Sequence, residues 1–215
     1  MHFSASEKIR AEIASKPGWV FTAANLEHLN ASQGNVERTL ARLAERGAIR
    51  RISQGLYHYP KKGKVISELP PKPEQVAKAL TTGKGAVMIP SGATALHRLG
   101  LTTQVPMKYV YLTNRRSRLE HVGKLTVELK KVSPRHLTGA GTIAGEILSA
   151  IEYVGEKEAL APGFISKLAR KLDESDLDKL NSAVSTRFAW VKKVVTQINE
   201  TWRSQNELHT GSGSI

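Results

Sequence analysis

Residues 19–60 of this chain read WVFTAANLEHLNASQGNVERTLARLAERGAIRRISQGLYHYP. Thr22 can cap a short helix, and Ser32 can cap a second one after a tight turn by accepting hydrogen bonds from unpaired N–H groups. The second helix repeats apolar residues along one face and ends at Gly47. Two short runs on either side of Gln54-Gly55 predict a β-hairpin. This order predicts a winged helix-turn-helix, a motif that usually lays its second helix in the DNA major groove.

The polar face of the second helix carries side chains suited to reading base edges. Gln and Asn can pair with adenine and Arg with guanine, while further arginines suit phosphates. The alternative interpretation is an ordinary solvated face, but the turn, both helices, the hairpin and the charge agree on DNA binding. The expected DNA contacts are Ser32, Gln33, Asn35, Arg38, Arg42, Arg46, Arg50, Arg51 and Gln54.

The charge of the chain also points to a polyanion. The 215 residues carry a net charge of +13. Residues 61–137 hold 15 basic and 4 acidic residues, whereas residues 138–215 hold 9 and 10. A positive field of this size favours nucleic acid first and an acidic membrane surface second. No apolar run approaches the roughly 18 residues needed to span a membrane, and no N-terminal signal segment is visible, so we expect a cytoplasmic protein.

The predicted fold class is α+β, in two domains. Ser4 to Glu7 forms a capping box that opens a first helix and completes a three-helix core, so residues 1–60 are assigned to the winged helix-turn-helix. A proline-rich linker is expected at 61–73. Residues 74–209 are assigned to a small mixed α/β domain with C-terminal helices, and residues 210–215 to a disordered tail.

Within the second domain, strands are predicted at residues 87–89 and 108–112 and a clean alternating strand at 124–132. Ser91 is expected to cap the helix that follows the first of these strands. After Pro134 the pattern is helical. One long stripe is expected to pack as core rather than to form a docking surface. Its members are Leu177, Leu180, Val184, Phe188, Val191, Val194, Ile198 and Trp202.

Three motifs need separate interpretation. Glu128-Leu129-Lys130 has the Glu-x-Lys pattern of metal-dependent nucleases, but no aspartate precedes Asp173 and Glu120 is placed in a loop, so a solvated strand face is preferred. Residues 138–142, TGAGT, lack the Lys-Ser/Thr of a phosphate-binding loop and are expected to be a turn that opens a helix. With no cysteine and no histidine pair at helical spacing, we predict no catalytic residue, metal or cofactor.

The third motif is a cluster of arginines. Arg115, Arg116 and Arg118 are expected in a loop between strands, where they make a dense anion site suited to bidentate phosphate contacts. The cluster could brace DNA, bind RNA or meet an acidic protein surface. A merely solvated loop is an equal alternative.

Several segments resemble the antitoxins of the abortive-infection E type, the AbiEi family. They are the hairpin end Gly55-Leu56-Tyr57, the proline-rich link, the segment from Pro90 to Leu101 (PSGATALHRLGL) and the strand Tyr109 to Asn114. The resemblance covers about residues 5–137. It implies a two-gene system in which the antitoxin binds operator inverted repeats, represses its own operon and counteracts a nucleotidyltransferase-like toxin, directly or indirectly.

Because one winged helix covers few base pairs, a dimer on DNA is expected. Antitoxin activity is expected to lie after residue 73. A single-gene winged-helix regulator is the first alternative to the antitoxin, and an enzyme acting on nucleic acid is the second.

Overall fold

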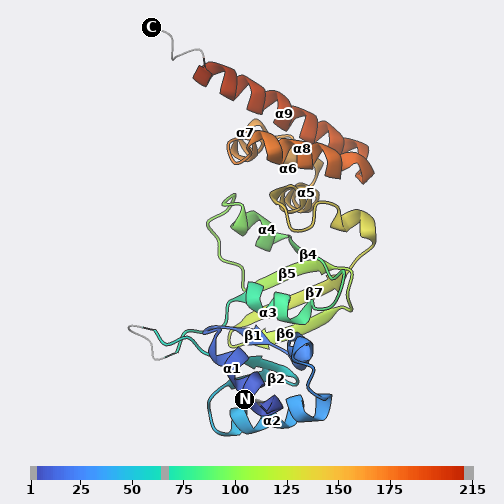
Figure 1. Ribbon diagram of the computed structural model, residues 1–215. Coiled ribbons are helices and arrows are strands. Elements are labelled where there is room, and N and C mark those ends of the chain that lie inside the picture. The colour runs from blue at the N-terminus through green and yellow to red at the C-terminus, as the bar shows by residue number, and fades with distance from the viewer. Residues whose placement is uncertain (1–3, 64–67, 211–215) are drawn as a thin grey trace. The chain divides into compact units, whose positions relative to one another are not determined.

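The computed structural model describes residues 4–63 and 68–210 and has an α+β fold, with helices and two small sheets (Figure 1). The chain forms two compact units. One comprises Met1–Ala86 and Leu119–Val127, and the other comprises Val87–Arg118 and Glu128–Ile215. The predicted linker lies partly outside the described residues. The helix after it, α3 (Pro73–Leu80), packs against β1 of the first unit, although the sequence suggested that it opens the second domain.

The first unit has its elements in the predicted order. They are α1 (Ala5–Ala14), β1 (Val20–Phe21), η1 (Ala23–Leu29), α2 (Gln33–Glu45), β2 (Arg50–Ser53) and β3 (Leu56–His58). The three strands form an antiparallel sheet in the order β1-β3-β2. One apolar core joins these elements, with Ile9, Phe21, Leu26 and Leu40 fully buried. This core fixes α2 against α1 and leaves the opposite side of α2 in solvent.

Local signals set the ends of these helices, though not always as predicted. The capping box at Ser4 is present, because its hydroxyl accepts from the Glu7 amide and the Glu7 carboxylate accepts from the Ser4 amide. Ser32 stands at the start of α2, but its side chain makes no cap hydrogen bond, so the predicted side-chain cap is wrong. Thr22 stands at the predicted cap position of η1, in a capping box with Asn25, whose Oδ1 accepts from the Thr22 amide at 2.7 Å and from the Thr22 hydroxyl at 3.0 Å. The helix after Thr22, η1, is a 3-10 helix. Asn30 follows it in the left-handed conformation, with a φ of 53°, and turns the chain toward α2.

A four-stranded sheet has the order β4-β5-β7-β6. Its strands, with the helix after β4, are β4 (Met88–Ser91), α4 (Ala93–Arg98), β5 (Lys108–Thr113), β6 (Arg118–Val122) and β7 (Leu125–Lys131). Pro90 continues β4 instead of ending it, because β4 is an edge strand and needs no amide there. Ser91 is therefore strand, and Gly92 occupies the cap position of α4. The prediction that Ser91 caps this helix is wrong.

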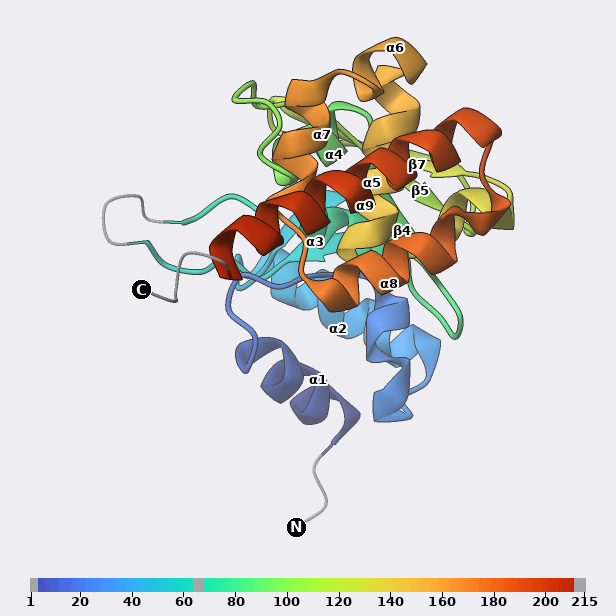
Figure 2. The same ribbon diagram turned by 90° about the horizontal axis from the view of Figure 1, so that it is seen from above.

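The part of the chain after β7 is helical. It contains η2 (Pro134–Leu137), α5 (Ile143–Val154), α6 (Glu156–Ala159), α7 (Pro162–Ala169), α8 (Glu174–Ala183), η3 (Val184–Thr186) and α9 (Ala189–Thr210). The α5 helix is buried along most of its length, and α9 runs across α5, α7 and α8 (Figure 2). The predicted apolar stripe is not one helix, because it turns a corner between α8 and α9. Phe188 at that corner is 52% exposed, while Leu180, Val191 and Ile198 are buried as expected.

Two predictions concern the membrane and the tail. None of the helices in the described part of the chain is long and apolar enough to cross a membrane. Thr210 is the last residue of α9, so it does not belong to a tail, and residues 211–215 lie outside the described residues.

Candidate nucleic-acid interface

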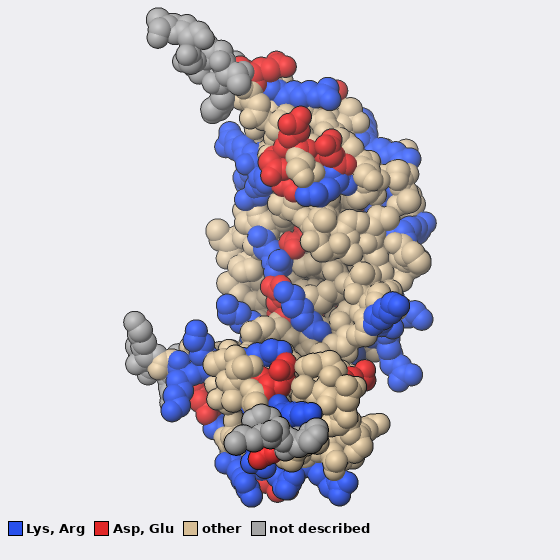
Figure 3. All heavy atoms as spheres, viewed as in Figure 1, with Lys and Arg blue, Asp and Glu red and all other residues tan. Residues whose placement is uncertain are grey.

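All nine residues predicted to contact DNA are exposed. They lie just before α2, along it, at its end, and in the β2–β3 hairpin. The apolar period of α2 buries Val36 and Leu40 and leaves these polar side chains on the other faces. Figure 3 shows Lys and Arg side chains along the lower edge of the view, where Figure 1 places α2.

The residues on α2 do not form a single row. Asn35, Arg42 and Arg46 follow one another at steps of seven and four residues, so they line one flank of the helix. Gln33 is two residues from Asn35 and therefore lies about 200° away around the axis. Its Nε2 donates to Glu37 Oε1 at 2.9 Å. The structure thus separates Gln33 from the arginines of the opposite flank.

Arg38 lies between the small residues Gly34 and Ala41, one turn before and three residues after it. Its Nε donates to the Gly34 carbonyl at 3.0 Å, and its Nη2 reaches Asn35 Oδ1 at 3.4 Å. These contacts fold the guanidinium back over the start of α2. Because its neighbours are small, Arg38 has space to extend toward a base edge.

Helix α1 adds groups to the arginine flank. Arg42 Nη2 donates to Ser6 Oγ at 3.2 Å, and Ser6 Oγ lies 2.8 Å from Thr39 Oγ1. A narrow hollow beside these contacts is lined in part by Arg10, Arg42 and Arg46. Arg10 was not predicted. The spacing of Ser6 and Arg10 puts them on one face of α1, but the sequence does not say that this face meets α2.

The hairpin arginines differ from each other. Nε of Arg50 donates to Glu68 Oε2 at 3.0 Å, its Nη2 donates to the other oxygen, and its Nη1 donates to the Gly47 carbonyl at 2.6 Å. A phosphate bound by Arg50 would therefore compete with Glu68. Arg51 is exposed on the same strand. Across the sheet, burial lowers the pKa of His58, the Glu68 carboxylate opposes this shift and the Arg50 guanidinium adds to it.

The arginine cluster is only partly a loop. Arg116 is exposed, whereas Arg115 is half-buried. Arg118 is also exposed but begins strand β6, so its placement in a loop is wrong. Two hydrogen bonds tie this segment down: the Arg115 amide donates to Thr113 Oγ1 at 3.1 Å, and Ser117 Oγ accepts from the Lys131 amide at 2.9 Å. Arg115 and Arg116 therefore lie in a turn of defined shape, and Arg118 lies at the start of β6.

The glutamate of the Glu-x-Lys motif forms ion pairs with lysine side chains. Glu128 Oε2 lies 2.9 Å from Lys108 Nζ and 3.8 Å from Lys130 Nζ. Glu120, expected in a loop, is a buried residue of β6. Within residues 4–63 and 68–207, no group of three or more His, Cys, Asp or Glu side chains could hold a metal ion.

The TGAGT segment makes a turn before α5, with Thr142 at the cap position of the helix, as predicted. Its Gly139 has a φ of 79°, and a Cβ built there would lie 2.8 Å from the Gly145 amide nitrogen. Glycine is therefore required at position 139 by backbone conformation and by close approach to α5.

These features define an α+β protein with an exposed basic helix-and-hairpin surface. The chain belongs to a family of unknown function, DUF6088, whose model matches residues 7–177. Among solved structures it is similar to the RV2827C protein from Mycobacterium tuberculosis, with 14% sequence identity, a TM-score of 0.48, and coverage of 92% of this chain and 76% of that one. No curated protein matches the sequence.

Proposed function

We propose that this protein is a DNA-binding repressor whose α1, η1, α2 and β2–β3 hairpin form a winged helix-turn-helix. One observation carries the proposal: every residue expected to face DNA is exposed, on one helix and the hairpin that follows it. A basic surface built this way offers base-reading groups on the helix and phosphate-binding groups on either side.

In this proposal α2 enters the major groove with Arg38 toward base edges and Asn35 beside it. Arg42 and Arg46, with Arg10 of α1, bind phosphates along one strand. Arg51 binds the phosphate backbone of the DNA from the β2–β3 hairpin. Because a single winged helix covers few base pairs, two copies occupy two half-sites of an inverted repeat.

The second part of the proposal is an antitoxin role, supported by the AbiEi resemblance. The protein represses its own operon in the cytoplasm and counteracts a nucleotidyltransferase-like toxin, by contact or through the toxin's target. Arg115, Arg116 and Arg118 would form the anion-binding part of the second unit. Their charge would raise the rate of association with an acidic partner and make it sensitive to salt. The proposal involves no catalytic residue, metal or cofactor.

The alternative proposal is a single-gene transcriptional regulator with the same DNA surface. The neighbouring gene separates the two proposals, because an antitoxin requires a nucleotidyltransferase-like reading frame beside its own. The exposed arginines of α2 support both proposals equally, whereas the resemblance favours the antitoxin.

Full-length variants test both roles in one strain that carries the promoter fused to a reporter and the neighbouring gene under separate control. Arg38→Ala with Arg42→Ala should release the reporter and keep protection from the toxin. Arg116→Ala with Arg118→Ala should keep repression and lose protection. Lys192→Ala with Lys193→Ala is the matched control, since it removes two exposed positive charges from α9. Full repression by the variant of Arg38 and Arg42 would refute the assignment of the DNA-binding surface. Full protection from the toxin by the variant of Arg116 and Arg118 would refute the assignment of the antitoxin surface.

A further inference from the structure

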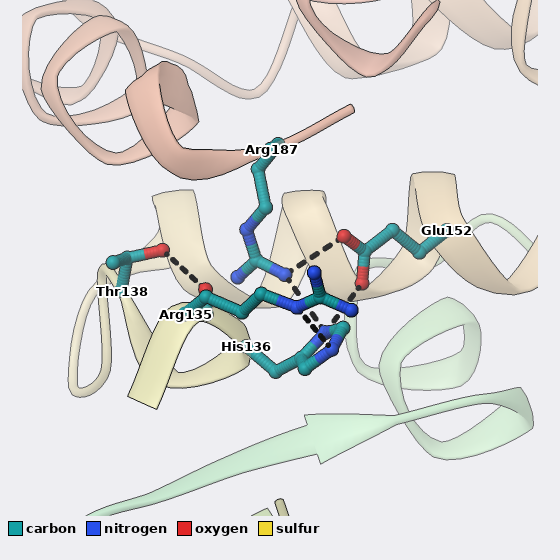
Figure 4. A network of polar contacts seen from close by, with 5 residues as sticks. All are labelled: Arg135, His136, Thr138, Glu152 and Arg187. Atoms are coloured by element: carbon teal, nitrogen blue, oxygen red, sulfur yellow. Dashed lines mark hydrogen bonds and ion pairs between the residues drawn. The ribbon is translucent and has the colours of Figure 1, made fainter. Parts of the chain in front are cut away.

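A buried arginine lies at the corner between α8 and α9. Arg187 is 6% exposed and follows η3 directly. Its Nη1 donates to Glu152 Oε1 of α5 at 2.8 Å (Figure 4). A buried guanidinium is costly without an opposite charge, so Glu152 provides the ion pair that keeps Arg187 inside the fold.

One edge of the Arg187 guanidinium makes no hydrogen bond within the described residues. Nε and Nη2 of Arg187 are buried, and within the part of the chain that the structure describes neither has a hydrogen-bond partner. In Arg50 and Arg98 the same two nitrogens bind both carboxylate oxygens of a glutamate. These atoms share one edge of the guanidinium, and in Arg187 that edge faces away from Glu152 (Figure 4). An edge of this kind is suited to two oxygens of an oxyanion.

Glu152 is held so that it cannot fill this edge. Arg135 Nε donates to His136 Nε2 at 3.1 Å, and because a guanidinium can only donate, this ring nitrogen accepts. The other ring nitrogen, Nδ1, lies 3.4 Å from Glu152 Oε2 and 3.4 Å from Nη1 of Arg187 (Figure 4). One Glu152 oxygen is thus bound by Arg187 and the other by His136. Turning the carboxylate toward the vacant edge would break both contacts.

The surface beside Arg187 is a small hollow with a net positive charge. It measures about 80 Å³ and is lined by Arg135, His136, Glu152, Thr186, Arg187 and Phe188. The two guanidiniums and the one carboxylate of this lining sum to a charge of +1. A cavity needs about 10–15 Å³ of this kind of volume to hold one water molecule, so the hollow has room for a larger group, such as phosphate.

An aromatic ring stands next to this hollow. Phe188 is 52% exposed, and the Arg135 guanidinium lies 5.4 Å from its ring centroid. Exposed aromatic rings and arginine planes are the surfaces on which nucleobases stack. A ligand with a phosphate in the hollow could therefore place a planar base against Phe188.

We propose that this hollow binds a nucleoside monophosphate, with its phosphate on the vacant edge of Arg187 and its base against Phe188. The site is independent of the proposed DNA surface, because all of its residues belong to the second unit. Since Nε and Nη2 of Arg187 are buried, the phosphate reaches them after side-chain rotations at the rim of the hollow. Side-chain rotations of this kind are common on binding.

Isothermal titration calorimetry of the full chain with AMP, adenosine and inorganic phosphate tests the proposal. AMP should bind at least tenfold tighter than inorganic phosphate, and adenosine should show no binding. Arg187→Lys keeps the charge beside Glu152 but removes the two-nitrogen edge, and it should weaken AMP at least tenfold. Arg203→Lys, on the exposed face of α9, is the matched control and should bind AMP like the parent protein.

Phe188→Ala keeps the test valid if Arg187→Lys does not fold, because Phe188 is exposed at a corner. This variant should weaken AMP while leaving the affinity for inorganic phosphate unchanged. Binding of AMP that is unaltered in both variants would overturn the proposal, and so would the absence of AMP binding to the parent protein at millimolar concentration. Equal affinities for AMP and adenosine would also overturn it, since the phosphate would then contribute nothing.

Discussion

Replacing Gly145 by alanine should destabilise the protein, even though alanine is the better helix former. Gly145 lies in the first turn of α5, against the turn that contains Gly139. A Cβ on Gly145 would lie 2.8 Å from the Gly139 carbonyl carbon, closer still to its oxygen, and 3.2 Å from Ile89 Cδ1. The atoms met first belong to the backbone, so the whole turn has to move.

Two opposing effects set the size of the change. Alanine gains at most about 1 kcal/mol over glycine in a helix. Forcing extra atoms into a packed contact typically costs about 1–3 kcal/mol. The two nearest atoms belong to the Gly139 backbone, which cannot rotate away as the end of a side chain can. We therefore expect the upper end of that cost and a net loss of about 2 kcal/mol in the free energy of unfolding. For a chain of this size, that corresponds to about 4–8 °C in Tm.

Thermal and urea unfolding followed by circular dichroism measure this difference. Gly163→Ala is the matched control, because Gly163 is also helical and a Cβ there would meet nothing within 4 Å. It should leave stability unchanged or raise it by up to about 1 kcal/mol. If Gly145→Ala proved as stable as Gly163→Ala, the close approach of the two segments would not constrain the fold, and the reasoning would fail.

Two further predictions concern stability. Burial holds the pKa of His58 below its usual value of 6.5, so on acidification the unfolded chain takes up the proton before the folded one, and stability should fall as the pH drops below 6.5. Urea titrations between about pH 5 and pH 8 should show this fall, and His58→Gln should flatten it; an unchanged slope would contradict the assignment. Asp173 caps α8 by accepting from the Asp176 amide at 2.7 Å, so Asp173→Ala should cost about 1 kcal/mol in the free energy of unfolding. Ser32→Ala should change it by less than about 0.5 kcal/mol, because Ser32 makes no side-chain cap, and equal losses in the two variants would show that the cap assignments are wrong.

Local sequence signals predicted most elements of the fold. The capping box at Ser4 and the hairpin at Gln54-Gly55 depend on neighbours within a few residues, so the sequence contains all that is needed to find them. Strand β6 was missed because it is short and charged and lies at a sheet edge, where apolar alternation is not required. The corner at Phe188 was missed because steps of three and four residues continue across it, although the helix does not.

The candidate sites likewise have some features that the sequence predicts and others that it does not. Exposure of Arg38 and Arg42 follows from the helical period, which is a local property. Their surroundings do not, since Arg42 contacts Ser6 of α1, and Arg50 binds Glu68, 18 residues away. The pairing of Arg187 with Glu152 spans 35 residues and leaves no local pattern. Long-range ion pairs of this kind depend on packing that single-sequence patterns do not specify.

Fluorescence anisotropy of the full chain on DNA from its own promoter tests the central claim most directly. Arg38→Ala with Arg42→Ala should weaken promoter binding. The lost base contact of Arg38 should cost about 1–3 kcal/mol and relax discrimination against unrelated DNA, and the lost phosphate contact of Arg42 should weaken both DNAs alike. Arg51→Ala should weaken both DNAs alike and reduce the salt slope by about 1. Lys192→Ala with Lys193→Ala should change neither. Promoter affinity that is unaltered when Arg38 and Arg42 are both replaced would contradict the assignment of α2 as the helix that reads DNA.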